Sequence, residues 1–354
     1  MLITNLKLQN FRNYKELNLN FNEGINVIYG DNAQGKTNIL ESIFLTSLGK
    51  SFRTNKDKEL IMFNEDFAKV EVEFSKTDRD GKIKIDLTDK KDIYLNGVKI
   101  KKLSELLGNI HIVIFTPDDI NILKNGPTGR RRFLDIFIGQ LRPNYIYNLN
   151  MYLKALEQRN NYLKQIKFEN KSEELLEIWD EKIAEYAEIV FKYRFEFINK
   201  LKEKIKDVHN SITENNEDIN IEYISDFSNK EEFLKKLKNN KKLDILKGFT
   251  TKGVHRDDFN IYINDNLVNI YGSQGQHRTS ILSLKMSELQ VVKDEIGENP
   301  ILLLDDFMSE LDEKRRTNFL RNIRETQVII TCTEKINIEN LNFKVYNVKS
   351  GKII

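Results

Sequence analysis

The sequence predicts an α/β fold in which a mixed sheet with flanking helices is interrupted by a long inserted helical segment. Short apolar strands occur early in the chain, at residues 25–29, and again late, at 300–306 and 326–333. Between them, from about residue 130 to 247, apolar residues recur every three or four positions, which is typical of helices. Buried strands on both sides of a helical segment indicate one sheet, completed by both ends of the chain.

The first 125 residues contain mostly strand patterns. Six short runs alternate apolar and polar residues or are apolar throughout, and Asn96 with Gly97 forms a hairpin signal between two of them. One helix is predicted directly after residue 37, where apolar residues lie at helical spacing. These are Ile39, Leu40, Ile43, Phe44 and Leu48.

Two long apolar stripes, at residues 145–166 and 176–208, predict a pair of antiparallel helices that cover each other. Ser228 and Glu231 are expected to form a capping box for a further helix. After Gly248 the pattern returns to strands and turns. We therefore expect two domains. One is a head formed by residues 1–125 and 248–354, and the other is an all-helical arm formed by residues 126–247.

Composition limits the class of protein. The chain has 354 residues, of which 40% are hydrophobic and 31% charged, so it can bury a full core. Its 56 basic and 54 acidic residues give a net charge of +2, so any affinity for nucleic acid must come from a local patch. A single cysteine, Cys332, excludes an internal disulfide and favours a reducing, cytoplasmic location. No apolar run is long enough to span a membrane.

The segment GDNAQGKT, residues 30–37, matches the phosphate-binding loop G-x-x-x-x-G-K-[ST]. It lies between a predicted apolar strand and a predicted helix, which is the context that the motif requires. In such loops backbone N–H groups surround an anion, the lysine reaches the terminal phosphates and the hydroxyl binds Mg2+. The candidate nucleotide-binding residues are Gly30, Asp31, Asn32, Ala33, Gln34, Gly35, Lys36, Thr37 and Asn38.

The segment ILLLDD places two carboxylates at the end of an apolar strand, where open α/β sheets bind their ligands. Asp305 is expected to hold Mg2+ through water, together with Thr37. Asp306 is expected to orient or activate the attacking water. Lys36 and Asp306 are thus the candidate catalytic residues.

The segment GSQGQHR places Ser273 and Gly275 at the start of a predicted helix, whose dipole favours an anion. Taken alone, Ser273 is equally well explained as an ordinary N-cap. A further short segment, SELD at residues 309–312, follows the acidic strand. Taken alone this segment indicates no function, and it becomes informative only through its position after the other motifs.

The order of these motifs resembles the ABC and SMC type of ATPase head. That order is a phosphate loop, a long helical insertion, S-x-G-Q at a helix start, an apolar strand ending in D-D, and S-E-L-D. Nine stretches in sequence are similar to the bacterial recombination mediators within this family, across the whole chain. They are LKLQNFRNY, GDNAQGKTNILESI, KSFRT, FTPDD, GPTGRRRFLD, GVHRDD, YGSQGQHRTSILSLK, LLLDDFMSELD and VIITCTE.

The resemblance implies roles for further residues. Ser273, Gly275 and Gln276 correspond to the signature motif, which in this family contacts the γ-phosphate of ATP held by a second subunit. ATP then joins two chains, and a symmetric dimer has two shared sites. Arg12 and Asn13 resemble residues that approach the nucleotide, and Arg53 resembles a loop arginine that contacts phosphate or DNA.

Some positions differ from the general ABC pattern. Gln274 replaces the first glycine of S-G-G-Q, which disfavours a transporter. Asp306 stands where ABC motors usually have glutamate, and this shorter carboxylate is consistent with slow turnover. Thr331 and Thr333 occupy the region of the usual switch histidine, and no glutamine follows the strand in IVIFTPDD.

The resemblance further implies an ATP- and Mg2+-dependent protein of DNA repair, replication and the SOS response. Such a protein is a weak DNA-dependent ATPase in the cytoplasm, associated with the nucleoid. Its implied partners are duplex DNA, gapped junctions, a second copy of itself, and RecR, RecO and RecA. Candidate DNA contacts are Arg53, Arg130, Arg131 and Arg132, with further basic clusters at 200–206 and 235–242. The alternatives are a transporter motor subunit and a non-hydrolysing scaffold assembled by ATP.

Overall fold

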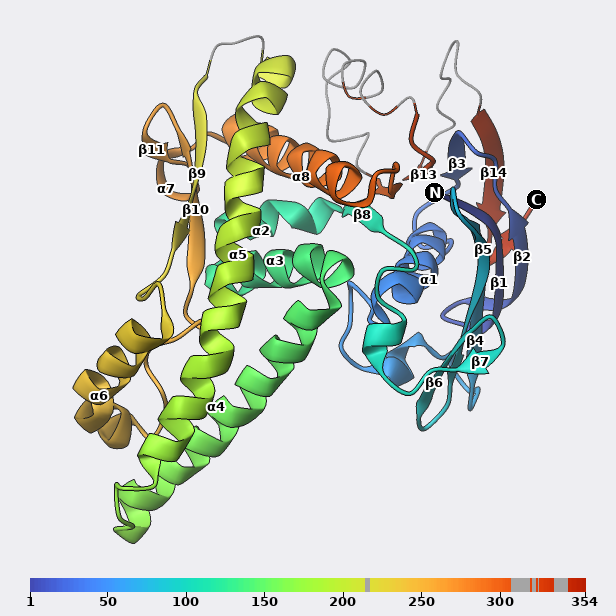
Figure 1. Cartoon of the computed structure of the whole chain (residues 1–354). Coiled ribbons are helices and arrows are strands. Elements are labelled where there is room, and N and C mark those ends of the chain that lie inside the picture. The colour runs from blue at the N-terminus through green and yellow to red at the C-terminus, as the bar shows by residue number, and fades with distance from the viewer. Residues whose placement is uncertain (214–216, 307–318, 320–322, 324, 334–342) are drawn as a thin grey trace. The chain divides into compact units, whose positions relative to one another are not determined.

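The computed structural model describes residues 1–213, 217–306, 319, 323, 325–333 and 343–354 (Figure 1). Its contacts divide the chain into two compact units, which we describe separately. The first comprises Met1–Ile120, Ser211–Glu214 and Leu282–Ile354, and the second comprises Asn121–Asn210 and Asn215–Ile281. The predicted SELD segment, residues 309–312, lies outside the described residues.

A largely parallel sheet in the first unit is built from both ends of the chain, as the sequence predicts. Its strand order is β15-β14-β3-β13-β12-β8, and all strands except β15 are parallel to their neighbours. β12 and β13 are buried along their whole length, which explains their uninterrupted apolar sequences. The strands are β3 (Ile25–Tyr29), β8 (Ile112–Phe115), β12 (Ile301–Asp305), β13 (Val328–Cys332), β14 (Phe343–Lys349) and β15 (Lys352–Ile353).

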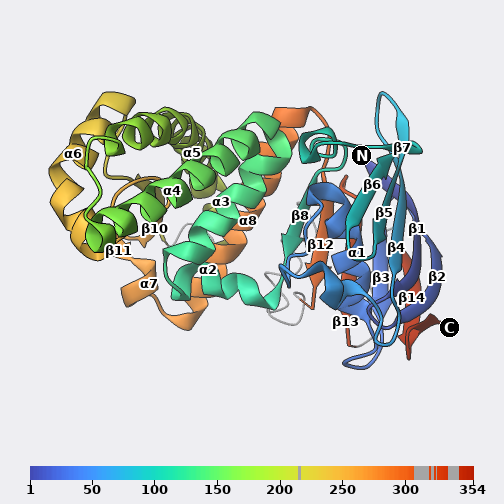
Figure 2. The same cartoon turned by 90° about the horizontal axis from the view of Figure 1, so that it is seen from below.

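A second sheet in the first unit is antiparallel and has the order β2-β1-β4-β5-β6-β7. Helix α1 (Lys36–Leu48) contacts strands of both sheets and therefore lies between them (Figure 2). Eleven of its thirteen residues are buried, so its sequence shows little amphipathic character. The strands are β1 (Leu2–Phe11), β2 (Tyr14–Asn20), β4 (Ala68–Ser75), β5 (Asp80–Leu87), β6 (Lys91–Leu95) and β7 (Val98–Lys99), with 3₁₀ turns at Asp57–Leu60, Leu103–Glu105 and Pro117–Ile120.

The second unit is mainly helical. α4 (Pro143–Glu169) and α5 (Leu176–Thr213) form the predicted antiparallel pair, because Tyr145 near the start of α4 contacts Tyr193, while Leu163 near its end packs on Leu176. The other elements are α2 (Asn121–Lys124), α3 (Pro127–Leu141), α6 (Lys230–Lys247), β10 (Asp258–Ile263), β11 (Asn266–Leu267) and α7 (Val268–Tyr271). Helix α8 (Gln274–Ile296) begins in this unit and continues into the first.

Two local expectations for the helical segment are wrong. It is not all helical, because β9 (Ile219–Ile224) pairs antiparallel with β10 in a three-stranded sheet. The alternation of buried Ile219 and Ile221 with more exposed residues is a strand pattern, and its partner strand lies beyond the predicted arm. The N-cap of α6 is Asn229, which accepts from the Glu232 N–H, rather than Ser228.

Candidate functional site

Two glycines of the loop between β3 and α1 occupy positions that larger residues do not fit. Gly30 has φ +154°, and an added Cβ would lie 2.3 Å from the carbonyl oxygen of Val348. Gly35 has φ +109°, and its Cβ would lie 2.4 Å from the Asn13 side chain. Glycine is therefore required at both positions, where the chain turns before the N-terminus of α1. No side chain caps that N-terminus among the described residues.

Lys36 closes this loop from inside. Its side-chain ammonium donates to the carbonyl oxygens of Gly30 (2.7 Å) and Asp31 (2.9 Å), and the residue is only 5% exposed. The charge is therefore held over the loop, at the start of a helix whose dipole also favours an anion. This arrangement suits the binding of phosphate groups.

Two carboxylates and two hydroxyls meet at the end of β12. The Thr37 hydroxyl donates to Asp305 Oδ1 at 2.8 Å, and so does the hydroxyl of Thr331 on the neighbouring strand β13. Thr331 also accepts from the backbone N–H of Asp306 at 3.0 Å. Asp306 has φ 46°, a left-handed conformation that Asp and Asn adopt more readily than most residues.

The environment of Asp305 disfavours its charged form. Burial raises the pKa of this carboxyl, while hydrogen bonds from Thr331 and Thr37 oppose part of the rise. A hydroxyl and a carboxylate are oxygen ligands that Mg2+ prefers, usually together with substrate phosphates and water. The described residues hold no cluster of three or more His, Cys, Asp or Glu that could bind a metal by itself. Thr37 and Asp305 therefore fit a cation that also takes ligands from a nucleotide.

Asn13 and the C-terminal hairpin hold the rim of the loop. Asn13 donates to the Gln34 carbonyl oxygen at 2.8 Å and accepts from the Asn38 side chain at 2.8 Å. The backbone N–H of Ser350 donates to Gln34 Oε1 at 2.6 Å. Ser350 was not predicted from the sequence. Only the turn residues Ser350 and Gly351 signal a bend there, and nothing local places that bend against the loop.

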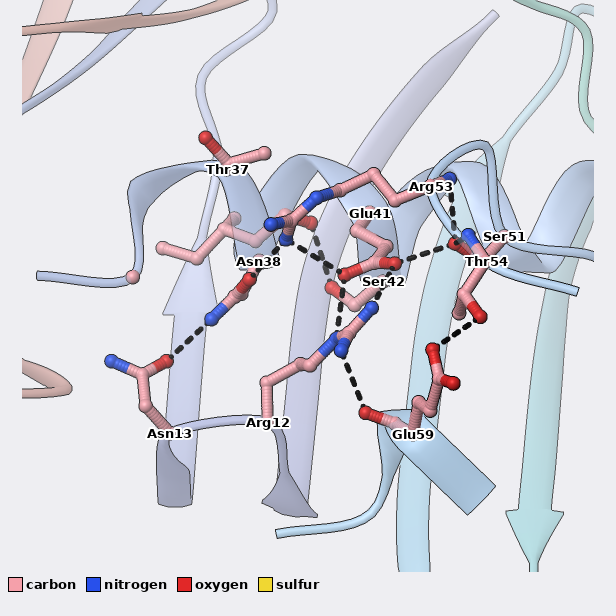
Figure 3. A network of polar contacts seen from close by, with 12 residues as sticks. Arg12, Asn13, Thr37, Asn38, Glu41, Ser42, Ser51, Arg53, Thr54 and Glu59 are labelled. Atoms are coloured by element: carbon pink, nitrogen blue, oxygen red, sulfur yellow. Dashed lines mark hydrogen bonds and ion pairs between the residues drawn. The ribbon is translucent and has the colours of Figure 1, made fainter. Parts of the chain in front are cut away.

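Arg12 and Arg53 share a partner that was not predicted from the sequence either. Both guanidinium groups approach the carboxylate of Glu41, one turn along α1 from Thr37 (Figure 3). Arg12 binds it through two hydrogen bonds, of 2.9 and 2.7 Å, whereas Arg53 is 3.4 Å away. The only signal in the sequence was a charged residue inside an otherwise buried helix.

The predicted signature residues form a capping arrangement at the start of α8. The Ser273 N–H donates to Gln276 Oε1 at 2.9 Å, and the Gln276 N–H donates to Ser273 Oγ at 3.2 Å. Gln276 Nε2 donates to Glu217 Oε1 at 2.9 Å. Gly275 is exposed, and among the described residues a Cβ added there would meet only Ser273 Oγ, at 3.8 Å. The described part of the chain therefore does not require a glycine at this position.

The arginine run at 130–132 divides into residues with different environments. Arg130 is 5% exposed and forms a two-point ion pair with Asp258, at 2.5 and 2.9 Å, so the expectation that it contacts DNA is wrong. The side chain is needed inside the unit, where it also donates to the Ile122 carbonyl oxygen. Arg131 is half-buried and donates to the Asp257 carbonyl oxygen, whereas Arg132 is exposed.

Comparison with known proteins connects these features. The family model described as RecF/RecN/SMC N terminal domain matches residues 2–353. The chain is 44% identical to the DNA replication and repair protein RecF of Acetivibrio thermocellus, covering 97% of this chain and 96% of the relative. The RecF of Lachnospira eligens is 45% identical, with coverage of 100% and 99%.

Solved structures agree with this similarity. The structure of a recombination mediator protein RecF with ATP, of the RecFOR pathway, has a TM-score of 0.93 and 40% identity, covering 99% of this chain and 96% of that one. An SMC head domain from Pyrococcus furiosus has a TM-score of 0.57 at 18% identity, covering 99% and 95%, which indicates the fold alone. Within the described residues, no helix is long and apolar enough to cross a membrane.

Proposed function

Because this chain belongs to the RecF family, within the RecF, RecN and SMC group, we propose that it is an ATP-dependent DNA-binding protein of recombinational gap repair. In this proposal ATP closes a homodimer on duplex DNA near single-strand gaps. Slow hydrolysis reopens the dimer, and the protein helps RecR and RecO to load RecA. The 40% identical RecF supports the choice of nucleotide, since that protein was solved with ATP.

The observation that carries the proposal is the alignment of Lys36, Thr37 and Asp305 at one end of the parallel sheet. Lys36 supplies a positive charge that its hydrogen bond to the Gly30 carbonyl oxygen keeps in place, and the Thr37–Asp305 pair suits Mg2+. When bound, Mg2+ neutralises charge on the phosphates. Asp306 is the next residue, and its backbone N–H donates to the Thr331 hydroxyl. We propose that its carboxylate orients the attacking water.

Gly275 supports a site that is shared between two chains. A glycine that neither the backbone conformation nor the packing of its own chain requires often lies where a ligand or another backbone approaches closely. Gly275 is exposed and lies in the first turn of α8, and of the described residues only Ser273 approaches the position of its Cβ. We assign this open surface to the γ-phosphate of ATP held by a second copy, with Ser273 and Gln276 beside it.

The exposed face of α6 is our candidate for contact with DNA phosphates. Lys235, Lys238 and Lys242 are exposed and lie on one face at spacings of three and four. None of the three forms an ion pair with any described residue, whereas Lys241 on the same helix pairs with Glu173 at 2.9 Å. A row of unpaired lysines along one helix face is suited to a phosphate backbone.

A gel-mobility measurement on a gapped duplex, with and without ATP, tests the proposal. We expect retardation that depends on ATP in the wild type and is absent in Lys36→Ala, because that substitution removes the phosphate-binding charge. DNA binding that is indifferent to ATP would rule the proposal out. Single-turnover release of phosphate distinguishes a hydrolysing clamp from a scaffold that uses ATP only to assemble.

A further inference from the structure

Glu41 is a buried carboxylate with an unusual set of partners. Its side chain is 0% exposed, although it lies on a helix next to the phosphate loop. A buried charge is costly unless it is paired and its oxygens are hydrogen-bonded. Here Oε1 accepts from Arg12 and from the Ser51 hydroxyl, and Oε2 accepts from Arg12 and Arg53 (Figure 3).

The two arginines are held unequally. Arg12 makes three hydrogen bonds, two to Glu41 and one to the Glu59 carbonyl oxygen at 2.7 Å, and its side chain is 20% exposed. Arg53 is 44% exposed, and its polar side-chain contacts within the described part of the chain are a 2.9 Å bond to Asn38 and the 3.4 Å approach to Glu41. Arg53 therefore retains donors that face solvent, whereas Arg12 is fixed.

The loop that carries Arg53 is attached to the same carboxylate. The Ser51 hydroxyl donates to Glu41 and accepts from the backbone N–H groups of Arg53 (2.9 Å) and Thr54 (3.1 Å). Glu41 thus fixes the backbone of residues 51–54 as well as the Arg53 guanidinium. One carboxylate sets the position of this loop relative to α1.

A chain of side-chain contacts leads from Arg53 to the phosphate loop. Arg53 donates to Asn38, and Asn38 donates to Asn13 (Figure 3). Asn13 in turn donates to the Gln34 carbonyl oxygen. The exposed donors of Arg53 are consequently attached to the rim of the loop in which we place the nucleotide. This connection favours a nucleotide phosphate, rather than a DNA phosphate, as the group that Arg53 meets.

We propose that Glu41 is a positioning residue that holds Arg53, through its guanidinium and through Ser51, for contact with a phosphate of the bound nucleotide. The inference rests on the proposed function, because it needs ATP at the phosphate loop. Glu41 itself does not touch the nucleotide. Arg12 makes two hydrogen bonds to Glu41, so the buried carboxylate stays paired while Arg53 directs its other donors to the phosphate.

A double-mutant cycle on ATP affinity tests this role. Glu41→Gln and Arg53→Ala should each weaken ATP binding by roughly tenfold, the value of one charge-assisted hydrogen bond. If Glu41 acts through Arg53, adding Glu41→Gln to Arg53→Ala should cost little more. A purely structural role predicts that the two effects multiply, which would overturn the proposal. Glu16→Gln is the matched control, because Glu16 is exposed on β2 and forms no ion pair with any described residue.

A second variant and a DNA-binding measurement complete the test. If Glu41→Gln fails to fold, Ser51→Ala replaces it, because it removes the hydrogen bonds that hold the backbone of residues 51–54 and leaves every charge in place. Ser51→Ala should show the same coupling to Arg53→Ala. Nucleotide-free binding of each variant to duplex DNA is measured in parallel, and a loss confined to DNA would overturn the assignment to nucleotide. If the wild type fails to bind ATP, the proposed function is at fault. If the wild type binds ATP and Glu41→Gln and Ser51→Ala bind it equally well, only this inference is wrong.

Discussion

The Thr37 hydroxyl donates to Asp305 Oδ1 at 2.8 Å and so connects the start of α1 with the end of β12. These residues are 268 positions apart in the chain, yet they form the edge at which a nucleotide-bound cation fits. Thr331 donates to the same oxygen, so two hydroxyls fix the orientation of a buried carboxylate. The burial that makes Asp305 useful also makes its charge costly.

Asp305→Asn is expected to stabilise the nucleotide-free protein. Because the pKa of folded Asp305 is raised above 3.8, the folded state binds more protons than the unfolded state between these two pKa values. Its contribution to stability therefore falls as pH rises through that window and is unfavourable at neutral pH. We expect thermal unfolding at pH 7 to show a higher Tm for the variant than for the wild type.

The same Asn variant should lose the Mg2+ dependence of ATP binding, which titration with and without the metal measures. Asp31→Asn removes an exposed carboxylate from the nearby phosphate loop and should leave Tm unchanged. A decrease in Tm for Asp305→Asn would show that its charged form is stabilised in the fold.

Lys36→Ala and Asp306→Asn should separate nucleotide binding from hydrolysis. Lys36 is placed for the ground-state phosphates, so its loss should abolish ATP-dependent dimers. Asp306→Asn should keep or prolong those dimers and slow phosphate release by about 10²- to 10³-fold, the effect of losing one positioned catalytic group. Asparagine tolerates the left-handed backbone at this position. Wild-type turnover in Asp306→Asn would remove this carboxylate from the mechanism.

Glu217→Ala should promote ATP-dependent dimerisation. Gln276 Nε2 is bound to the Glu217 carboxylate, so the amide must leave that partner to reach a phosphate on a second chain. Light scattering should show a monomer without nucleotide, a dimer with ATP, and a midpoint at a severalfold lower protein concentration for the variant. Gln276→Ala should lose the dimer. Asp218→Ala removes the neighbouring acid, which pairs with Lys206 instead, and should resemble the wild type.

The lysine face of α6 should account for the salt dependence of DNA binding. The logarithm of the binding constant falls with log salt by about 0.9 per phosphate contact on B-form DNA. Replacing Lys235, Lys238 and Lys242 by glutamate should therefore flatten the slope by roughly three, without abolishing ATP-dependent dimers. Lys241→Glu on the same helix should have a smaller effect, because Lys241 already has an acidic partner. An unchanged slope in the triple variant would exclude this face, and Arg132 would then be tested.

Arg130→Ala should destabilise the second unit rather than weaken DNA contacts directly. Removing one member of a buried ion pair leaves Asp258 without its partner, which typically costs about 3–5 kcal/mol. Arg132→Ala, at an exposed neighbour, should change the unfolding free energy by no more than about 1 kcal/mol, the usual limit for a contact at the surface. Chemical denaturation compares the two. Equal stabilities would contradict the structural role of Arg130.

The sequence by itself determined the features that depend on neighbours along the chain. Mainly apolar runs identified β3, β12 and β13, and the apolar stripes identified α4 and α5, because burial on one or both faces imposes a local pattern. The phosphate loop was also predicted from neighbouring residues in the sequence. Its glycines, Lys36 and Thr37 act within eight consecutive residues, and their spacing reflects the geometry of one turn into one helix.

Only the tertiary structure decided which charged side chains are available for binding. Arg130 and Arg132 are two residues apart and look alike in sequence, yet Asp258 draws the first into the interior. The partners of Glu41 come from the turn after β1 and from the loop after α1, and Gln34 contacts Ser350 from the opposite end of the chain. A charge is buried or exposed according to the elements that pack around it, and such long-range contacts leave no periodic signal in the sequence.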